Sequence, residues 1–153
     1  MNEFTHTNKD GKAVMVDISL KKIQKRRAIA SGKILLKSET IDLINQNLIK
    51  KGDVISIARI ASIQGAKSTS SLIPLCHPIG ITSINVDIIV NTNDIEIISS
   101  VTCIERTGIE MEALTSVSVG LLTIYDMCKA VDKNMQISEI KLISKTKEDI
   151  INE

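Results

Sequence analysis

The segment Leu72–Pro78, LIPLCHP, holds both prolines of the chain, one of its two histidines and one of its three cysteines. Proline fixes φ and restricts the residue before it, so Pro74 and Pro78 stiffen both ends of the run between them. A short rigid segment that presents an imidazole suits a binding site, and it also suits a tight corner. The pattern therefore makes His77 a candidate site residue without deciding between catalysis and packing.

Two other chemistries would use the same segment. Cys76 beside His77 suggests a Cys–His nucleophile, yet sequence neighbours usually point apart, and such a dyad is a spatial arrangement. A zinc site would need more ligands, and His6, Cys103 and Cys128 do not have ligand spacing. Both interpretations are disfavoured.

Carboxylates and ammonium groups line one side of a long helix expected near the C-terminus. Glu112 and Asp126 are separated by about 40° around the helix axis, and Asp126 and Lys129 are i,i+3 neighbours that can pair, with Lys133 on the same side. The plain interpretation is a solvated face with routine ion pairs. However, the same stripe also contains residues that are too small or apolar for such a face, namely Ser116, Val119, Gly120 and Thr123. This composition predicts that the stripe packs against something, so its carboxylates need partners.

Two lysines, Lys51 and Lys67, stand near the ends of two further expected helices. Taken singly, each is best explained as a surface lysine. The other cations that would form a polyphosphate pocket with them are Arg26, His77, Lys129 and, on weaker grounds, Arg59 and Arg106. The chain has neither Gly-x-Gly-x-x-Gly nor the Walker pattern, so any phosphate binding must come from side chains.

The composition is that of a globular domain and not of a nucleic-acid or membrane-surface binder. The 153 residues carry a formal net charge of +1, whereas such binders need a large positive field. Phe4 and Tyr125 are the only aromatic residues, so bases would have almost nothing to stack on. Three cysteines without a Cys-x-x-Cys pair, and no signal-like or long apolar run, predict a cytoplasmic protein.

Alternation of apolar residues predicts four strands. They are expected at Ala28–Leu36, at Ile81–Val90, at Ile95–Ile104 after a hairpin turn, and at 136–144. In the first strand Ala28, Ala30 and Gly32 share a face, which would let a helix approach closely.

Capping signals and helical periodicity predict three helices. The first runs from an N-cap at Ser38 to a terminal Gly52, and the second covers 54–67 after an Asp53 cap and is apolar nearly all round, hence buried. The third runs from a Thr107–Glu110 capping box to about Lys133.

The expected order β-α-α-β-β-α-β is α+β and indicates a ferredoxin-like antiparallel sheet with helices packed on one face. Residues 13–145 are expected to form a single domain, preceded by a mobile segment at 1–12 and followed by a charged tail at 146–153.

Several long motifs occur in a distinctive order: MVDIS at 15–19, KGDV at 51–54, ARIASIQGAK at 58–67, LIPLCHP at 72–78 and TGIEMEALTSVSVGLLTIYDMCKAV at 107–131. Together they closely resemble the cyclic pyranopterin monophosphate synthase family, the accessory protein C of molybdenum cofactor biosynthesis. The similarity extends from about Thr5 to Ser144.

The resemblance implies a lyase that converts (8S)-3′,8-cyclo-7,8-dihydroguanosine 5′-triphosphate, a cyclised GTP derivative, to cyclic pyranopterin monophosphate with release of pyrophosphate. It also implies a homohexamer, a trimer of dimers, with the active site at a subunit interface. It implies no cofactor, with Mg²⁺ accompanying the triphosphate left open, and neither a nucleic-acid nor a membrane partner.

Carried over residue by residue, the resemblance implies catalytic roles for Lys51, Asp126 and Lys129, which would move protons. It implies substrate binding by Arg26, Lys67, Leu75, Cys76, His77, Met111 and Glu112. Among these, Arg26, Lys67 and His77 would hold the triphosphate, and Met111 and Glu112 would orient the base-derived ring. Two alternatives remain beside this hypothesis: a non-enzymatic sensor oligomer for an anionic nucleotide, and a zinc-dependent nucleotide cyclohydrolase using Cys76 and His77.

Overall fold

A computed structural model describes residues 10–150; most of the segment predicted to be mobile, residues 1–9, lies outside them, as do residues 151–153. The elements follow in the order β1 (Gln24–Leu35), α1 (Ser38–Asn45), α2 (Val54–Lys67), α3 (Thr69–Leu72), β2 (Ile81–Val90), β3 (Asp94–Glu105), α4 (Glu110–Cys128) and β4 (Gln136–Asp149). No helix of the described part of the chain is long and apolar enough to cross a membrane.

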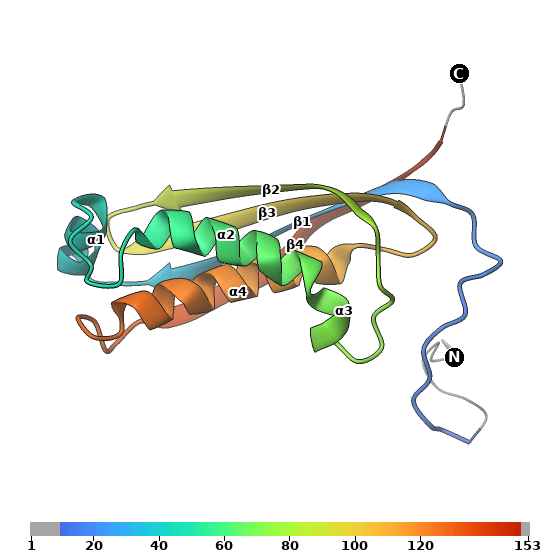
Figure 1. Cartoon of the computed structure of the whole chain (residues 1–153), viewed down its shortest axis with the longest axis horizontal. Coiled ribbons are helices and arrows are strands. Elements are labelled where there is room, and N and C mark those ends of the chain that lie inside the picture. The colour runs from blue at the N-terminus through green and yellow to red at the C-terminus, as the bar shows by residue number, and fades with distance from the viewer. Residues whose placement is uncertain (1–9, 151–153) are drawn as a thin grey trace.

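The four strands form one antiparallel sheet in the order β2-β3-β1-β4. The long helices α2 and α4 lie side by side against one face of this sheet (Figure 1). This arrangement confirms the α+β, ferredoxin-like fold predicted from the order of elements. It also places the two ends of α4 at opposite ends of the molecule.

The core lies between the sheet and the helices. Alternate residues of β3, including Ile95, Ile97 and Val101, face the helices and are fully buried, as strand periodicity requires. A Cβ atom added at Gly32 would lie 2.8 Å from Val117 Cγ1, so the predicted close approach of a helix to β1 is confirmed. The small residues of β1 therefore set the distance at which α4 packs.

Small residues also let α2 and α4 pack closely. A Cβ atom at Gly65 would lie 2.8 Å from Val119 Cβ, and one at Gly120 would collide with the Ser62 hydroxyl. The prediction that the small-residue stripe of α4 packs against another element is confirmed, and that element is α2. The prediction that α2 is buried all round is wrong, because its outer face is solvent-exposed, with Ile60 67% exposed.

The first helix ends earlier than expected. Helix α1 stops at Asn45, and Asn47 adopts φ 55° after it. Asn47 N donates to Ile44 O at 3.0 Å and Leu48 N to Leu43 O at 2.8 Å, which is the Schellman pattern. Gly52 does have a positive φ of 107°, but it lies in the loop before α2, and the predicted Ser38 cap is wrong because Lys37 holds the N-cap position.

The third helix is shorter than predicted at its C-terminal end. Helix α4 begins at Glu110 after Ile109, with no side-chain cap, so the capping-box prediction is wrong. Instead, Glu110 forms a 2.9 Å ion pair with Lys145 of β4. The helix ends at Cys128, and the carbonyl of this residue accepts from Val131 N and Asp132 N in a turn.

The last strand is longer than predicted. Strand β4 continues past Ser144 to Asp149 and pairs with the start of β1, so residues 146–149 of the expected charged tail belong to the sheet. It is an edge strand with both faces largely exposed in this stretch, which is where charged residues are common in strands. For that reason the sequence here has no apolar alternation that would indicate a strand.

Candidate active site

A pocket of about 300 Å³ lies at the N-terminal end of α4. Five of the predicted substrate-binding residues line it, namely Leu75, Cys76, His77, Met111 and Glu112. The other lining residues are Val16, Ile18, Lys21, Ile79, Thr107, Gly108 and Glu110. The structure thus brings together two segments that are more than thirty residues apart in the sequence.

The LIPLCHP segment reaches this pocket from the end of α3. Buried Thr69 anchors the preceding turn, since its hydroxyl donates to Ala66 O at 3.0 Å and Ile73 N donates to Thr69 O at 2.9 Å. Cys76 N then donates to Ile73 O at 3.1 Å, so the chain turns just before His77. Both prolines stiffen this turn, as the sequence predicted.

Glu112 is the most unusual charged group of the pocket. It is only 3% exposed, and no salt bridge of the described residues involves it. Burial raises the pKa of this carboxyl above its ordinary value, and the negative charge of Glu110 adds to the increase. A buried carboxyl of this kind can hold or release a proton nearer to neutral pH than an ordinary glutamate.

The environment of the Cys76 thiol, beside His77, does not favour a nucleophile. Burial raises the pKa of Cys76, and the negative charge of Glu112 raises it further. A thiol nucleophile needs a lowered pKa and a cationic neighbour, because the thiolate is the reactive form. The surroundings of Cys76 therefore favour a neutral side chain that packs against or contacts a ligand.

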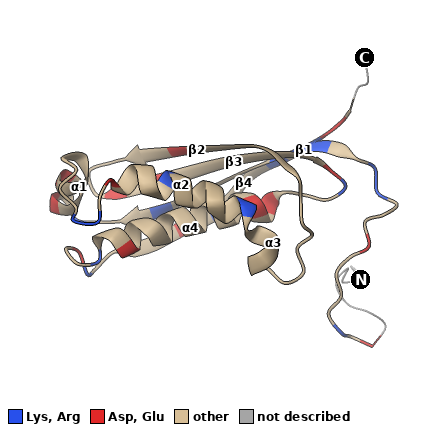
Figure 2. Ribbon diagram, viewed as in Figure 1, with Lys and Arg blue, Asp and Glu red and all other residues tan. Residues whose placement is uncertain are grey.

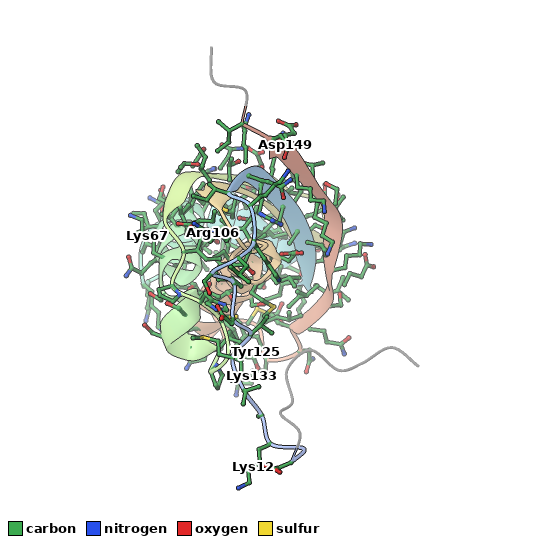
Figure 3. The ribbon with its side chains drawn as sticks, turned by 90° about the vertical axis from the view of Figure 1, so that its right-hand side faces the viewer. Lys12, Lys67, Arg106, Tyr125, Lys133 and Asp149 are labelled. Carbon is green, nitrogen blue, oxygen red and sulfur yellow. The ribbon has the colours of Figure 1, made fainter. Side chains whose placement is uncertain are left out.

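A cationic pocket of about 440 Å³ adjoins the first pocket and shares Lys21, Thr107 and Gly108 with it. Its other lining residues are Lys22, Gln24, Arg26, Arg106 and Lys147. Figure 3 looks onto this end of the molecule, with Arg106 near the middle. We call these two adjoining pockets the depression: the first contains the carboxyls of Glu110 and Glu112, and the second contains most of the lysine and arginine residues.

Sequence reasoning identified only part of this basic surface. Arg26 was predicted as a phosphate contact, and it lines the pocket, while its Nε donates to Glu105 O at 3.1 Å. The contributions of Lys21, Lys22 and Lys147 were missed. The run of basic residues before β1 was a usable signal for the first two, but Lys147 lies opposite Arg26 only through the pairing of β4 with β1.

Lys67 lies beside this depression and not in it. It lines a separate, shallow pocket with Ile63 and Ile79, and Ile79 is also part of the wall of the first pocket. The weaker candidate Arg59 lines neither pocket and donates from Nη1 to the backbone oxygen of Val86. Among the predicted and newly found cations, Lys21 and Arg26 therefore line these pockets, whereas Lys67 and Arg59 do not.

The three predicted catalytic residues form a second group at the other end of α4. Asp126 accepts from Lys51 Nζ at 2.6 Å and pairs with Lys129 Nζ at 2.7 Å, and Lys51 Nζ also donates to Asp126 O at 2.8 Å. The hydrogen bond from Lys129, followed by that from Lys51, lowers the pKa of Asp126 to about 2. In turn, the Asp126 carboxylate raises the pKa of Lys129. The predicted i,i+3 pair is confirmed, and Lys51 joins it from the loop before α2.

A single chain keeps the two groups far apart. Glu112 and Asp126 are fourteen residues apart on one helix, which corresponds to about 21 Å along its axis. Figure 2 shows acidic residues at both ends of α4, with the basic loops beside them. One small substrate cannot contact both groups in the same chain.

The zinc alternative would require several metal-ligating side chains close together. Within residues 10–150, no set of three or more His, Cys, Asp or Glu side chains is placed to hold a metal ion. All three cysteines are free, and Cys103 and Cys128 are buried in the core.

A family profile and individual curated relatives place this chain in the same family. The sequence profile of the MoaC family matches residues 15–148. The chain belongs to the MoaC family. Among curated relatives, a protein of Clostridium botulinum (strain Alaska E43 / Type E3) is 50% identical over 157 residues, covering 99% of both chains. Proteins of Clostridium perfringens (strain SM101 / Type A) and Thermoanaerobacter sp. (strain X514) are also 50% identical, over 94% of this chain and 92% of theirs. All three are named cyclic pyranopterin monophosphate synthase, and this MoaC-family match agrees with the resemblance found in the motifs.

Proposed function

We propose that this protein converts (8S)-3′,8-cyclo-7,8-dihydroguanosine 5′-triphosphate to cyclic pyranopterin monophosphate and pyrophosphate, as an enzyme of molybdenum cofactor biosynthesis. The observation that carries the proposal is the depression at the start of α4, where a buried carboxyl, Glu112, lies beside a basic pocket. Such a site suits a ligand with a neutral heterocycle at one end and several negative charges at the other. The names of the half-identical relatives support the same reaction.

The triphosphate is assigned to the basic pocket. Arg26, Lys21 and Lys147 line it, and amine and guanidinium groups bind phosphate oxygens through charge-assisted hydrogen bonds. His77 stands at the edge of the first pocket and Lys67 next to it, where they would reach the same chain of phosphates or its product.

The base-derived ring is assigned to the first pocket. Met111 gives it an apolar contact, and Glu112 meets its polar edge from a buried position. Leu75 and Cys76 also line this pocket, and the proline-braced turn holds them in place. A preformed wall loses little conformational entropy when the ligand binds.

The second group of residues is assigned to the same reaction in a neighbouring subunit. Because about 21 Å separates Asp126 from Glu112 along α4, Lys51, Asp126 and Lys129 would act on a substrate held by another copy of the chain. A homohexamer built as a trimer of dimers, with the site at the subunit interface, would meet this requirement. There Lys51 and Lys129 would transfer protons or stabilise developing negative charge, with Asp126 holding both amines in position.

The chemistry assigned here needs no resident cofactor. Ring opening and ring closure break and form C–N bonds with accompanying proton transfers, and cyclic phosphate formation is a phosphoryl transfer in which pyrophosphate leaves, so no step changes the oxidation state. Mg²⁺ bound to the triphosphate would be part of the substrate. We place the reaction in the cytoplasm, consistent with three cysteines that are all free.

The deciding experiment is pyrophosphate release from the authentic cyclised triphosphate by purified, metal-analysed protein. Release of one pyrophosphate per pterin product is expected, with no stoichiometric zinc. Tight binding without pyrophosphate release would instead support a non-enzymatic sensor, and zinc-dependent turnover would support a cyclohydrolase that uses Cys76 and His77.

A further inference from the structure

The outer wall of the first pocket is a segment without regular secondary structure. Residues 16–21, called the strap here, precede β1, and Val16, Ile18 and Lys21 line the pocket together with Leu75 and His77. The strap is in neither the sheet nor a helix, and Leu20 is 100% exposed. Something other than a backbone ladder must therefore keep it against the pocket.

The strap has an internal turn that fixes its shape. The Asp17 carboxylate accepts from Ser19 N at 2.8 Å and from the Ser19 hydroxyl, and Lys21 N donates to Ile18 O at 3.1 Å. The bonds from Ser19 lower the pKa of Asp17. These contacts stay within the strap, so they give it a shape without attaching it to the domain.

Arg106 attaches the strap to the domain. Its Nη1 donates to Ser19 O at 2.8 Å and to Lys21 O at 2.5 Å. Among the described residues, the hydrogen bonds that join the strap to other parts of the chain are these two from Arg106. Both accepting carbonyls flank Leu20, so a single guanidinium holds the turn from one side.

The loop that carries Arg106 is itself anchored. Arg26 donates from Nε to Glu105 O at 3.1 Å and from Nη2 to Arg106 O at 3.4 Å. The attachment thus runs from β1 through Arg26 to the β3–α4 loop, and from Arg106 to the strap. Arg106 also lines the basic pocket, next to Thr107 and Gly108, which are shared by both pockets.

We propose that Arg106 is a positioning residue for this site, which holds the strap as the outer wall of the pocket so that Lys21 and Ile18 face the ligand. The proposal rests on the proposed function only for the identity of the ligand. It assigns to Arg106 an action through the backbone of the strap and not through a direct contact with phosphate.

The first test needs no ligand. Arg106→Ala and the control Arg59→Ala each delete an arginine that donates to backbone carbonyls, and neither adds or removes a lysine. Cleavage by a lysine-specific protease after Lys21 and Lys22, followed by mass spectrometry, should be about tenfold faster in Arg106→Ala than in wild type. The control should be cleaved at the wild-type rate. An unchanged rate in Arg106→Ala would show that the strap does not depend on this residue, and the proposal would fail.

The second test separates positioning from direct phosphate binding. Calorimetry with the cyclised triphosphate should give a Kd raised about tenfold by Arg106→Ala and about tenfold by Lys21→Ala, and by no more in the double variant, because Arg106 acts through the segment that holds Lys21. Turnover at saturating substrate should stay within about threefold of wild type in Arg106→Ala. Losses of affinity that multiply in the double variant, or an unchanged Kd in Arg106→Ala, would each overturn the proposal. The protease test and the calorimetry remain valid if wild type binds the ligand but releases no pyrophosphate, which would refute only the proposed function.

Discussion

The two ends of α4 carry the same kinds of residue in opposite environments. At the N-terminal end, Glu112 is buried in a pocket lined by three segments of the chain, and burial raises the pKa of its carboxyl. At the C-terminal end, Asp126 is exposed between two amines, and their hydrogen bonds lower its pKa to about 2. One helix therefore holds one carboxyl with a raised pKa and one that stays ionised at neutral pH.

This difference in pKa indicates different chemical roles for the two ends of α4. A group with a pKa near 2 cannot act as a general acid at neutral pH, so the role of Asp126 is to hold and orient the ammonium groups of Lys51 and Lys129. The raised pKa of Lys129 fits an acid or an electrostatic stabiliser better than a base. Under the proposed function, the pocket end would bind the substrate, and the amine end would act on a substrate that a neighbouring copy binds. The predictions below test this division.

The largest effect is expected at the amine end. Lys51→Ala or Asp126→Asn should lower turnover well over tenfold, on the order of a hundredfold, because each removes a proton-transfer group or its orienting partner. The measurement is pyrophosphate release at saturating substrate, with folding checked by circular dichroism. Lys141→Ala, which breaks an exposed ion pair with Glu139 on β4, is the matched control and should keep wild-type turnover. Near-normal turnover in both amine-end variants would remove these residues from the mechanism.

Mixing two inactive variants tests whether the two ends meet between copies. If a site uses Glu112 of one chain and Lys51 of another, randomly mixed Lys51→Ala and Glu112→Gln subunits should recover about a quarter of the wild-type turnover per site. The subunits are co-refolded in equal amounts, and each variant alone serves as the baseline. No recovery in mixed oligomers would mean that each site draws both residues from one chain, contrary to the 21 Å estimate from the length of α4.

The pocket end should show a conflict between stability and activity. Because burial raises the pKa of Glu112, the folded protein keeps a proton at pH values where the unfolded chain has released it, and the free energy of unfolding falls as the pH rises through that interval. Glu112→Gln stays neutral, so it should be more stable than wild type by about 0.5–2 kcal/mol at pH 8 and by less at pH 4. Its turnover should fall about tenfold or more at both pH values. Denaturant unfolding at the two pH values is the measurement, and equal stability differences would contradict a desolvated carboxyl.

Prediction of the fold from the sequence worked where burial imposes a period. Strand β2 was located residue for residue at 81–90, and α2 at 54–67 with its Asp53 cap, whose side chain accepts from Ser56 N. The errors lie where no such period exists. Thr107 and Glu110 have capping-box spacing, but Glu110 pairs instead with Lys145, a partner supplied by a strand distant in the sequence.

The same distinction holds for the site. Motif resemblance identified Leu75, His77 and Glu112, and the structure gathers them in one pocket. The strap could not be found in this way, because it has neither helical nor strand periodicity. Arg106 was predicted only as a weaker candidate for a phosphate-binding cation and not as a residue that donates to backbone oxygens. Carbonyl acceptors have no signature in a sequence, and the pairing that places Lys147 opposite Arg26 is a property of the sheet.

The smallest effect is expected for Cys76, although it lies at the centre of the most distinctive motif. Burial and the charge of Glu112 raise the pKa of its thiol, so the thiolate that covalent catalysis requires is disfavoured in this pocket. Cys76→Ser keeps a small side chain and the backbone that lines the pocket, and its turnover should stay within about threefold of wild type. Glu112→Gln in parallel shows the effect of losing a group that orients the ligand in the same pocket. A hundredfold loss in Cys76→Ser would reverse the comparison, because the reactive group of the pocket end would then be a thiol and Glu112 would serve it as a base.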